Sequence, residues 1–588
     1  MKHDLIFCDS EVYQDDWLFC FEFLNGDRIS FHNDQAGLIK FVKEHKNDVF
    51  VGYNIRGYDQ WILKGICVGM NPKFINDKII KEDTPGWKVL QGKYPPSFNF
   101  YDAMTERIGL KKLEGHMGVS IIECSVPFNI ERPLTKEELE EVEFYCWSDV
   151  SELKRVFFER FNEFRAHYHL IQKFELPIQD FRFTKTQLAA KILEAKKRPK
   201  SDDEFDLIIP ENLKLEKYKF VVDWFLDPAN HELDKDGKPF KSLIIEIGGV
   251  KHSIRWGGTH SIDLVVCWEW DGEEQKMLIL DVKSYYPTLI LLYGLLPRSV
   301  ENAVKYAKIY EDRLTYKSNK DPIADALKAL LNSVFGATIY PGSNLYDPRQ
   351  GRNICVLGQL FLLDLLEKLE PFVKIINSNT DGLCVHPHNE ECYEKCQEIC
   401  QEWQERTGMV LEFENVIKCF QKDVNNYIWV TDSDKNNIKA RGDYKKPSVL
   451  KCDLGIIPVA VTNYFVYGIP VNESISANSD NLKLFQRIIS TGSFEAFCDP
   501  SGKEFDFRVA RWFACNKAAM STNLRWKTAS GKAERIPNTT PNGVILNDDI
   551  QGKKVPSWLD TEFYAKMIRS HIKIIEEGKR PQKSLSDF

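Results

Sequence analysis

Single acidic residues beside apolar runs are the first groups in this sequence that could do chemistry. Asp381 lies in NTDG, between the apolar runs VKII and LCVHP. This run–turn–run pattern predicts a β-hairpin with one carboxylate at its tip. Asn, Thr, Asp and Gly are also common turn residues, so an isolated NTDG favours a simple turn over a catalytic acid.

Other chemistry-bearing residues lie upstream of this hairpin. Asp281 follows the apolar run MLIL, at the end of an expected strand. In KALLNSVFG, Lys328 and Asn332 are i and i+4 on one face of an expected helix. Arg313 and Lys317 have the same spacing on the preceding expected helix, where a solvated basic face is an equally good interpretation.

The N-terminal region carries a second set of acids. Asp9 and Glu11 flank Ser10 at the end of the expected strand LIFCD and point to the same face, because residues i and i+2 of a strand do so. A divalent metal ion would relieve the repulsion between them. Asp59 follows VFVGYN at an expected strand-to-helix junction, and Tyr145 and Asp149 share a face of an expected helix. Each feature alone is more typical of a surface acid pair, a helix cap or an i,i+4 polar pair.

The elements that must position these groups are those of a mixed α/β chain. The first 175 residues begin with strand-like runs and then alternate helical and strand patterns, as in an α/β domain. Polar, Pro-containing connectors follow, and strands return from about Ile244. Helical periodicity dominates residues 300–331 and 358–369.

Composition and charge limit the possible functions. With 588 residues, 43% hydrophobic and 28% charged, the chain has room for about three to five domains with ample core. No apolar stretch is long enough to span a membrane, and the N-terminus predicts neither a signal nor a transit peptide. The net charge of −8 argues mildly against nucleic acid, although basic stretches near residues 196–200 and 439–446 could line a groove.

The N-terminal acids, taken together, resemble a nuclease motif set. Asp-x-Glu, Asn-x-x-x-Tyr-Asp and Tyr-x-x-x-Asp occur in the order and spacing of the ExoI, ExoII and ExoIII motifs of the DnaQ-like 3′–5′ exonucleases. The resemblance implies two Mg²⁺ ions across a phosphodiester, with a tyrosine that orients the attacking water. The residues implied are the metal ligands Asp9, Glu11, Asp59 and Asp149, the water-orienting Tyr145, and the DNA-contacting Asn54 and Tyr58.

Three later segments resemble a polymerase family. DVKSYYP, KALLNSVFG and NTDG stand in the order of motifs A, B and C of the family B DNA polymerases, usually DxxSLYPS, KxxxNSxYG and DTDS. Phe335 and Asn379 replace the Tyr and Asp that are usual there. The implied fold is α+β and multidomain: a right-hand polymerase with an antiparallel palm sheet, short helical fingers and a thumb, preceded by an RNase H-like α/β exonuclease domain. Two Mg²⁺ ions, with Mn²⁺ as a possible substitute, are implied in each active site.

The same resemblance implies roles for single residues in the polymerase half. Tyr286 would select deoxynucleotides by excluding a 2′-hydroxyl. The alternative is that Tyr286 is an ordinary tyrosine of the core. RWGGTH and NNYIWV are similar to the family's Tyr-x-Gly-Gly and Lys-x-Tyr DNA contacts. The implied residues are the metal ligands Asp281, Val282 and Asp381, the nucleotide-binding Lys328, Arg313, Lys317, Tyr286, Asn332 and Phe335, and the DNA-contacting Trp256, Gly257, Gly258 and Tyr427.

Spacing between the motifs indicates which kind of polymerase to expect. The short intervals leave little room for the insertions of protein-primed relatives, so we expect short fingers and priming from an existing 3′-hydroxyl, as in a phage or mobile-element replicase. The expected division is residues 1–175 exonuclease, 176–243 connector, 244–299 palm with motif A, 300–336 fingers with motif B, 337–430 palm with motif C, and 431–588 thumb and C-terminal region.

The main hypothesis is a DNA-directed DNA polymerase with 3′–5′ exonuclease proofreading, acting as a monomer on a DNA primer–template with dNTPs. Its expected partners are a helicase and a single-strand-binding protein, with no membrane, in the cytoplasm of a host cell. The alternative is a 3′–5′ DNA exonuclease whose degenerate polymerase body only binds DNA, motivated by Asn379 and the acidic pI. De novo primer synthesis stays open, whereas a non-enzymatic acidic scaffold explains none of the motif order.

Overall fold

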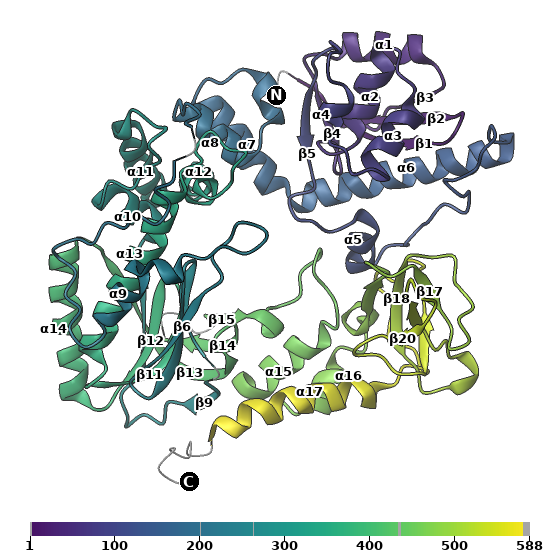
Figure 1. Ribbon diagram of the computed structural model, residues 1–588. Helices are drawn as coiled ribbons and strands as arrows, with labels where there is room; N and C mark the ends of the chain where they lie inside the picture. The colour runs from purple at the N-terminus through teal and green to yellow at the C-terminus, as the bar shows by residue number, and fades with distance from the viewer. Residues whose placement is uncertain (1–2, 200, 263, 433–436, 580–588) are drawn as a thin grey trace. The chain divides into compact units, whose positions relative to one another are not determined.

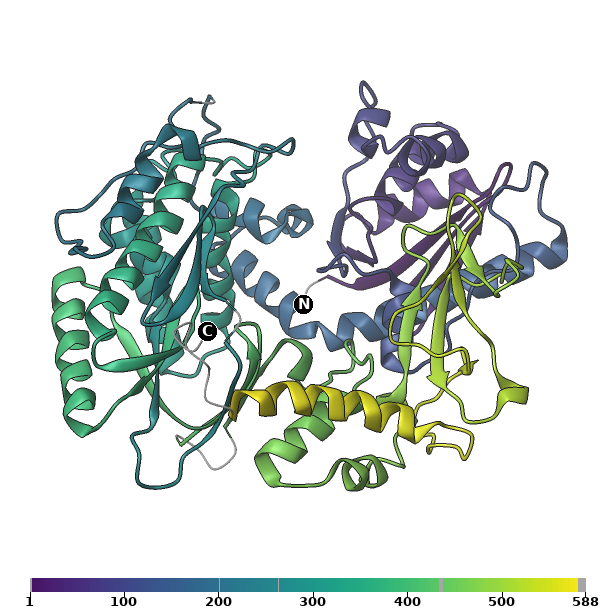
Figure 2. The ribbon, with the colours of Figure 1, turned by 60° about the horizontal axis from the view of Figure 1, so that its bottom comes forward.

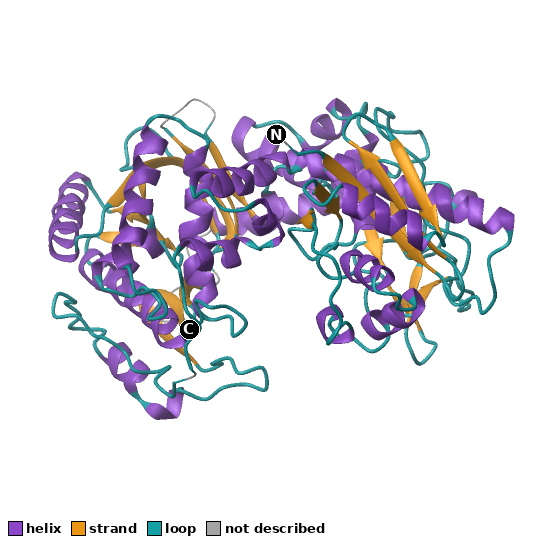
Figure 3. Cartoon of the chain, turned by 90° about the horizontal axis from the view of Figure 1, so that it is seen from above, coloured by secondary structure: helices purple, strands orange, loops and turns teal. Residues whose placement is uncertain are grey.

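Two compact units make up the chain, in a computed structural model that describes residues 3–199, 201–262, 264–432 and 437–579. Unit 1 comprises Met1–Phe183, Pro447–Ile456 and Ile475–Tyr564, and unit 2 comprises Thr184–Lys446, Ile457–Ser474 and Ala565–Phe588. Helices and strands mix in both units, which confirms the expected multidomain chain of mixed α and β structure (Figure 3). The chain returns to unit 1 after completing the main sheet of unit 2.

A five-stranded sheet in the order β3-β2-β1-β4-β5 forms the first part of unit 1. β1 is its central strand, antiparallel to β2 and parallel to β4. Helices pack on both faces of this sheet, so strand β1 is apolar on both sides up to Asp9 (Figure 1). The elements are β1 (Leu5–Val12), β2 (Trp17–Phe23), β3 (Arg28–His32), α1 (Gln35–Glu44), β4 (Val49–Gly52), α2 (Asp59–Cys67), α3 (Pro72–Ile80), α4 (Gly86–Val89), β5 (Asn99–Asp102), α5 (Leu110–Met117), α6 (Lys136–Glu159) and α7 (Phe161–Lys173).

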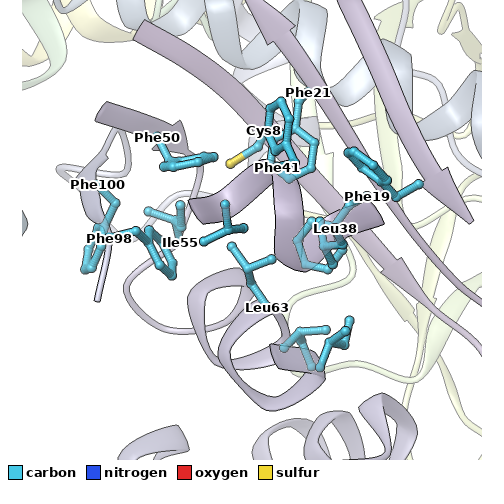
Figure 4. Packing of buried hydrophobic residues seen from close by; sticks show 14 of the residues in the cluster. Cys8, Phe19, Phe21, Leu38, Phe41, Phe50, Ile55, Leu63, Phe98 and Phe100 are labelled. Atoms are coloured by element: carbon cyan, nitrogen blue, oxygen red, sulfur yellow. The ribbon is translucent and has the colours of Figure 1, made fainter. Parts of the chain in front are cut away.

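The alternation of side chains along β1 decides which helix each residue meets. Cys8 points into an aromatic cluster formed with α1 and α2, which Figure 4 shows from close by. Phe7 points the other way, to Phe157 of α6, with 5.2 Å between the ring centroids. Since alternate residues of a strand share a face, Asp9 and Glu11 are directed toward α6 as Phe7 is.

The segment Ile475–Tyr564 adds two small antiparallel sheets to unit 1 (yellow-green strands in Figure 2). Their strand orders are β16-β18-β21 and β17-β19-β20. The strands are β16 (Arg487–Ser490), β17 (Ala496–Cys498), β18 (Val509–Ala514), β19 (Arg525–Lys527), β20 (Ala533–Arg535) and β21 (Gly543–Ile545). The sequence predicts that these residues belong to a thumb and C-terminal region, and that division stays a prediction.

A buried arginine joins this segment to the first part of unit 1. Arg511 of β18 is 0% exposed, and its guanidinium donates to backbone carbonyls only: those of Leu546 and Asp548 nearby, and those of Gly115 and Val119 at α5. Burial without a bound carboxylate lowers the pKa of Arg511 to about 10. The side chain therefore satisfies carbonyls from two distant stretches of sequence at once.

Unit 2 is built on an antiparallel sheet in the order β11-β12-β10-β13-β14-β15, with β9 also paired to β13. A separate sheet, β6-β7-β8, precedes it in sequence. The strands are β6 (Ser242–Ile247), β7 (Val250–Arg255), β8 (Gly258–Ser261), β9 (Val266–Glu269), β10 (Met277–Val282), β11 (Val373–Ser378), β12 (Gly382–Pro387), β13 (Leu411–Asp423), β14 (Asn426–Thr431) and β15 (Ile438–Arg441). β11 and β12 form the predicted hairpin, with Asn379 to Asp381 as its turn.

The helices of unit 2 surround α13, which is almost entirely buried. α11 and α12 are joined by four residues as a helical hairpin, as the sequence predicted for residues 300–336. The helices are α8 (Lys185–Ile192), α9 (Phe220–Leu226), α10 (Tyr285–Leu292), α11 (Ala303–Ser318), α12 (Ile323–Thr338), α13 (Pro348–Leu369) and α14 (Glu390–Thr407), while α15 (Ile456–Tyr467), α16 (Val471–Ala477) and α17 (Thr561–Glu576) run across the unit boundaries.

The connector after α8 runs along the length of α13. Its backbone amides at Ile208 and Lys214 donate to the side chains of Asn353 and Asp364, at 2.6 and 2.7 Å. These bonds satisfy polar groups of a helix that is otherwise packed on all sides. The connector therefore stabilises the central helix of unit 2.

Among the described residues, no helix is both long and apolar enough to cross a membrane.

Replacing Arg511 by Met should lower the free energy of unfolding by about 3 kcal/mol, because the buried carbonyls lose their donors while side-chain volume is kept. Urea denaturation of the full chain measures this. Lys517→Met, at an exposed position after the same strand, is the control and should change stability by less than about 0.5 kcal/mol. Equal stabilities of the two variants would show that Arg511 does not join the two parts.

Two candidate carboxylate centres

Carboxylates from three elements of unit 1 converge where β1 passes α6. Oxygen atoms of Asp9, Glu11 and Asp149 all lie within 4.8 Å of one another. Asp59, at the start of α2, accepts a 2.6 Å hydrogen bond from the hydroxyl of Ser10, which points to the other face of β1. The four acids singled out in the sequence are thus gathered in one region of unit 1.

Burial and crowding oppose the ionisation of this set. Desolvation, followed by the charges of neighbouring carboxylates, raises the pKa of Asp9 and of Glu11. Burial also raises the pKa of Asp149, and it raises that of Asp59 to about 7. A divalent cation would offset this cost, and oxygen ligands at this spacing fit the preference of Mg²⁺.

Lys111 of α5 belongs to this centre, although sequence reasoning assigned it no role. Its ammonium pairs with Asp149 and, at 3.0 Å, with Glu114, and lies 4.5 Å from the ring centroid of Tyr145. Burial opposes the charge, but the two carboxylates raise the pKa of Lys111, so it remains a cation. Lys111 therefore holds Asp149 and Tyr145 together. The signal lay in KKLE, where a lysine precedes a glutamate by three residues on an amphipathic helix.

The expected DNA-contacting residues of this half lie at the junction between β4 and α2. Asn54 has φ +63°, a left-handed conformation, and its backbone amide donates to Asp102 at 2.9 Å. The hydroxyl of Tyr58 donates to the side chain of Asn76 at 2.8 Å. Strained non-glycine residues persist where the surroundings hold them, as the Asp102 bond does here.

The second centre lies in unit 2, where β10 and β12 pair. Asp281 is opposite Gly382 in the antiparallel register, and the amide of Val282 donates to the carbonyl of Asp381 at 3.0 Å. Asp281 and Asp381 both line a cavity of about 370 Å³. The hairpin thus brings the two predicted carboxylates to one edge of the sheet, although they are one hundred residues apart.

Gly382 makes this approach possible. A Cβ atom at this position would lie 2.0 Å from the carboxylate oxygen Oδ1 of Asp281. The glycine of NTDG therefore leaves room for the Asp281 carboxylate where it lies, in addition to its part in the turn. Partial burial, and then the charge of Asp381, raises the pKa of Asp281 to about 6.

The helices beside this centre present the residues expected to bind a nucleotide. Lys328, Asn332 and Gly336 are exposed along one face of α12. The ring of Tyr286, at the start of α10, stacks on that of Phe335, with 4.0 Å between the centroids and 12° between the planes. Helices α10 and α12 are therefore joined by an aromatic contact in unit 2.

Arg313 and Lys317, which share a helical spacing, have different surroundings. Arg313 is buried and donates to the hydroxyl of Ser284 at 2.6 Å, whereas Lys317 is exposed and lies 3.9 Å from a carboxylate oxygen of Glu412. Ser284 has φ +54°. Arg313 thus stabilises a left-handed residue directly before α10, the helix that carries Tyr286.

The β7–β8 turn packs against the tip of the hairpin. A Cβ atom on Gly258 would lie 2.9 Å from the hydroxyl of Thr380. Trp256 is 2% exposed and its indole nitrogen donates to the carbonyl of Asn230, so its ring belongs to the core. His260 of β8, to which the sequence assigned no role, is half-buried beside Asn379, and burial lowers its pKa. Asn379 therefore faces the neighbouring sheet.

Tyr427 and Arg441 line the same cavity as the two aspartates. They are register partners on β14 and β15, and the Tyr427 ring stacks on Trp429 with 4.0 Å between centroids. Lys439 is paired with Glu414 at 2.6 Å. An aromatic ring and two cations therefore border the carboxylates on the β15 side.

Comparison with known proteins adds little to this geometry. No family model and no curated protein matches the sequence. Among solved structures, the chain is similar to the family B DNA polymerase from the hyperthermophilic archaeon Pyrobaculum calidifontis, with a TM-score of 0.41 and 14% identity over 99% of this chain and 79% of that chain. This likeness is too low to support a function, which must come from the site residues.

Mg²⁺ and low pH should both stabilise the metal-free protein. Because the pKa values of the unit 1 carboxylates are raised in the folded state, the folded protein binds more protons, and the free energy of unfolding falls as pH rises through about 7. Thermal unfolding in EDTA should give a higher Tm at pH 6 than at pH 8. At pH 8, Mg²⁺ at a hundredfold excess over its Kd should raise the free energy of unfolding by about 2–3 kcal/mol.

Asp9→Asn is the control for this prediction, because it removes one repelling charge from the buried set. The variant should show a smaller dependence of Tm on both pH and Mg²⁺. Identical responses in the wild type and in Asp9→Asn would mean that the unit 1 carboxylates bind no metal.

Proposed function

We propose that this chain is a template-directed DNA polymerase that extends a primer with deoxynucleoside triphosphates and carries a 3′–5′ exonuclease in unit 1. The observation that carries the proposal is the edge of the unit 2 sheet. There Asp281 and Asp381 line one cavity, and Tyr286 stacks on Phe335 of the helix that exposes Lys328. Paired carboxylates beside an exposed cation fit a triphosphate with its metal ions.

In the polymerase centre, each residue has a separate task. Asp281 and Asp381, with the carbonyl of Val282, supply oxygen ligands for divalent metal. Bound there, Mg²⁺ would lower the pKa of a primer 3′-hydroxyl and neutralise phosphate charge during in-line transfer. Lys328 binds the triphosphate, with Lys317 available once it leaves Glu412. Arg313, which the sequence assigned to nucleotide binding, is buried against Ser284, so we assign it the positioning of the Tyr286 helix instead.

The aromatic pair of Tyr286 and Phe335 would contact the sugar and the base of the incoming nucleotide. The Tyr286 ring, fixed by Phe335, would lie beneath the sugar and exclude a 2′-hydroxyl by contact, which selects deoxynucleotides. Asn332 and Phe335 would flank the new base pair. Gly257, Gly258 and Tyr427 would contact DNA near the hairpin tip, with Trp256 supporting the glycines from the core.

In the exonuclease centre, Asp9, Glu11, Asp59 and Asp149 would hold metal, and Tyr145 would orient the attacking water. Lys111 keeps Asp149 and Tyr145 in place. Asn54 and Tyr58, at the β4–α2 junction, would contact the DNA strand that is shortened. The two centres belong to different units, so extension and shortening are separable by mutation.

The wider assignment follows from the same proposal. The fold would be a right-hand polymerase with residues 244–299 and 337–430 as palm, 300–336 as short fingers and the C-terminal region as thumb. Mg²⁺, with Mn²⁺ as a substitute, would serve both centres. A monomeric phage or mobile-element replicase in the host cytoplasm, working with a helicase and a single-strand-binding protein, fits the compact motif spacing.

One observation favours the alternative, an exonuclease whose polymerase body only binds DNA. Among the described residues, the only three acidic, His or Cys side chains with ligand atoms within 4.8 Å of one another are Asp9, Glu11 and Asp149 of unit 1. The unit 2 centre has Asn379 where the family pattern has an acid. Extension and shortening must therefore be assayed separately.

Asp381→Asn should reduce primer extension by at least about 100-fold, because the loss of a charged metal ligand costs several kcal/mol in the transition state. A labelled primer–template with dNTPs and Mg²⁺ measures both reactions on one gel. Primer shortening should be unchanged in this variant. Asp9→Asn should show the reverse pattern, lost shortening with extension retained.

The wild type decides between the two functions in the same assay. Template-length products support the polymerase, whereas shortening without extension under every dNTP and metal condition supports the exonuclease alternative. Loss of both activities in Asp381→Asn would contradict the assignment of two independent centres.

Tyr286→Ala should raise the incorporation of ribonucleotides relative to deoxynucleotides by at least about tenfold, because the ring that meets the 2′ position is removed. Steady-state single-nucleotide insertion gives the ratio of kcat/KM values. Tyr285→Phe is the control, since Tyr285 is buried and its hydroxyl faces Gly358 of α13. Unchanged discrimination in Tyr286→Ala would place the sugar elsewhere.

A further inference from the structure

The β17-β19-β20 sheet of unit 1 has one apolar side and one side that carries cations. Phe497 and Trp526 are register partners on one side, where Phe497 is buried against Phe507. The alternate residues point to the other side. That side, the cationic face, is formed by Arg525 and Lys527 of β19 and Arg535 of β20. The small residues Ala496 and Ala533 and the buried Cys498, which is the register partner of Arg525, lie on the same side.

Two like charges are directly opposed on this face. Arg525 of β19 and Arg535 of β20 are register partners in adjacent antiparallel strands. Directly opposed like charges destabilise a sheet unless an opposite charge lies near. Among the described residues neither arginine forms an ion pair, and the Nε atom of Arg525 is buried without a hydrogen-bond partner. No carboxylate among the described residues therefore pairs with the two opposed arginines; that of Glu504 pairs with Lys527 instead.

Neighbouring residues extend the positive charge along the strand. Lys527 follows Arg525 by two positions, which places the two side chains about 7 Å apart on one face. Lys527 is paired with Glu504 at 2.6 Å, and Arg535 donates only to the carbonyl of Thr539 at 3.2 Å. The cationic face thus retains two guanidinium groups, those of Arg525 and Arg535, whose charge no carboxylate of the described residues neutralises.

We propose that the cationic face binds the phosphate backbone of a nucleic acid strand, with one phosphate bridging Arg525 and Arg535. Guanidinium groups bind phosphate oxygens bidentately, and a bridging phosphate would relieve the repulsion between the two strands. Lys527 lies along the strand at a spacing that suits the next phosphate of an extended chain, which it would bind on leaving Glu504. The choice of nucleic acid as the anion rests on the proposed function, whereas the anion site itself rests on the sheet register.

Arg535→Glu tests this proposal without unfolding the sheet. The new carboxylate would face Arg525 as a cross-strand ion pair, so the Tm should be unchanged or higher. Affinity for a fluorescent single-stranded oligonucleotide and for a primer–template, read by anisotropy in 50–200 mM salt, should fall about tenfold at the lowest salt. The slope of log K against log [salt] should become shallower by about one to two.

Two further variants isolate the effect of position from that of net charge. Lys136→Glu makes the same charge change at a side chain that is 84% exposed in unit 1, and should bind both probes nearly as the wild type does. Arg535→Lys keeps the charge and should retain most of the affinity. If Arg535→Glu binds both probes as Lys136→Glu does, with the Tm unaffected, the face does not hold nucleic acid and the proposal fails. The proposal also fails if the face binds an acidic protein instead of nucleic acid.

Failure of the proposed function gives a different result. A wild type that neither extends nor shortens a primer, but loses affinity through Arg535→Glu, would overturn the enzyme assignment and leave this site standing. If the wild type extends and shortens a primer but Arg535→Glu binds nucleic acid as the wild type does, the enzyme assignment stands and the cationic face is not a binding site.

Discussion

Repulsion between carboxylates is the constraint around which both units are organised. Asp9, Glu11 and Asp149 come within 4.8 Å of one another, and Asp281 lies beside Asp381, although burial and like charge raise the pKa of several of these acids. Such sets persist only where the surrounding fold holds them, and where a cation can offset the charge. Each centre is accordingly fixed by regular strands: by the alternation along β1 in unit 1, and by the register of β10 with β12 in unit 2.

Local adjustments then make room for the charged groups. Gly382 leaves space for the Asp281 carboxylate, and Gly358 of α13 leaves space for the hydroxyl of Tyr285, which would lie 2.0 Å from a Cβ atom there. Ser284 adopts a left-handed conformation that its bond to Arg313 secures. These features connect the sheet edge that carries Asp281 and Asp381 to the buried helix α13, so the position of Tyr286 depends on packing well below the surface.

Short-range patterns explain which parts of this arrangement were predictable. The shared face of Asp9 and Glu11, the NTDG hairpin and the helical hairpin of α11 and α12 follow from periods of 2 and 3.6 and from turn chemistry. Lys111 and His260 were missed because their roles come from partners far along the chain, as does the buried tie that Arg511 makes to α5. The membership of residues 475–564 in unit 1 also rests on such long-range contacts. The side chain of Trp256 lies in the core, a position that the similarity of RWGGTH to a DNA-contact motif does not predict.

The central claim is that two independent metal centres lie in the two units. Counting bound Mn²⁺ by electron paramagnetic resonance in the wild type, in Asp9→Asn and in Asp281→Asn tests it most directly, because binding is read without any reaction. The account predicts that each variant loses one class of bound manganese and retains the other at its original affinity. Equal manganese binding in the wild type and Asp281→Asn would contradict it, as would loss of both classes through a single substitution.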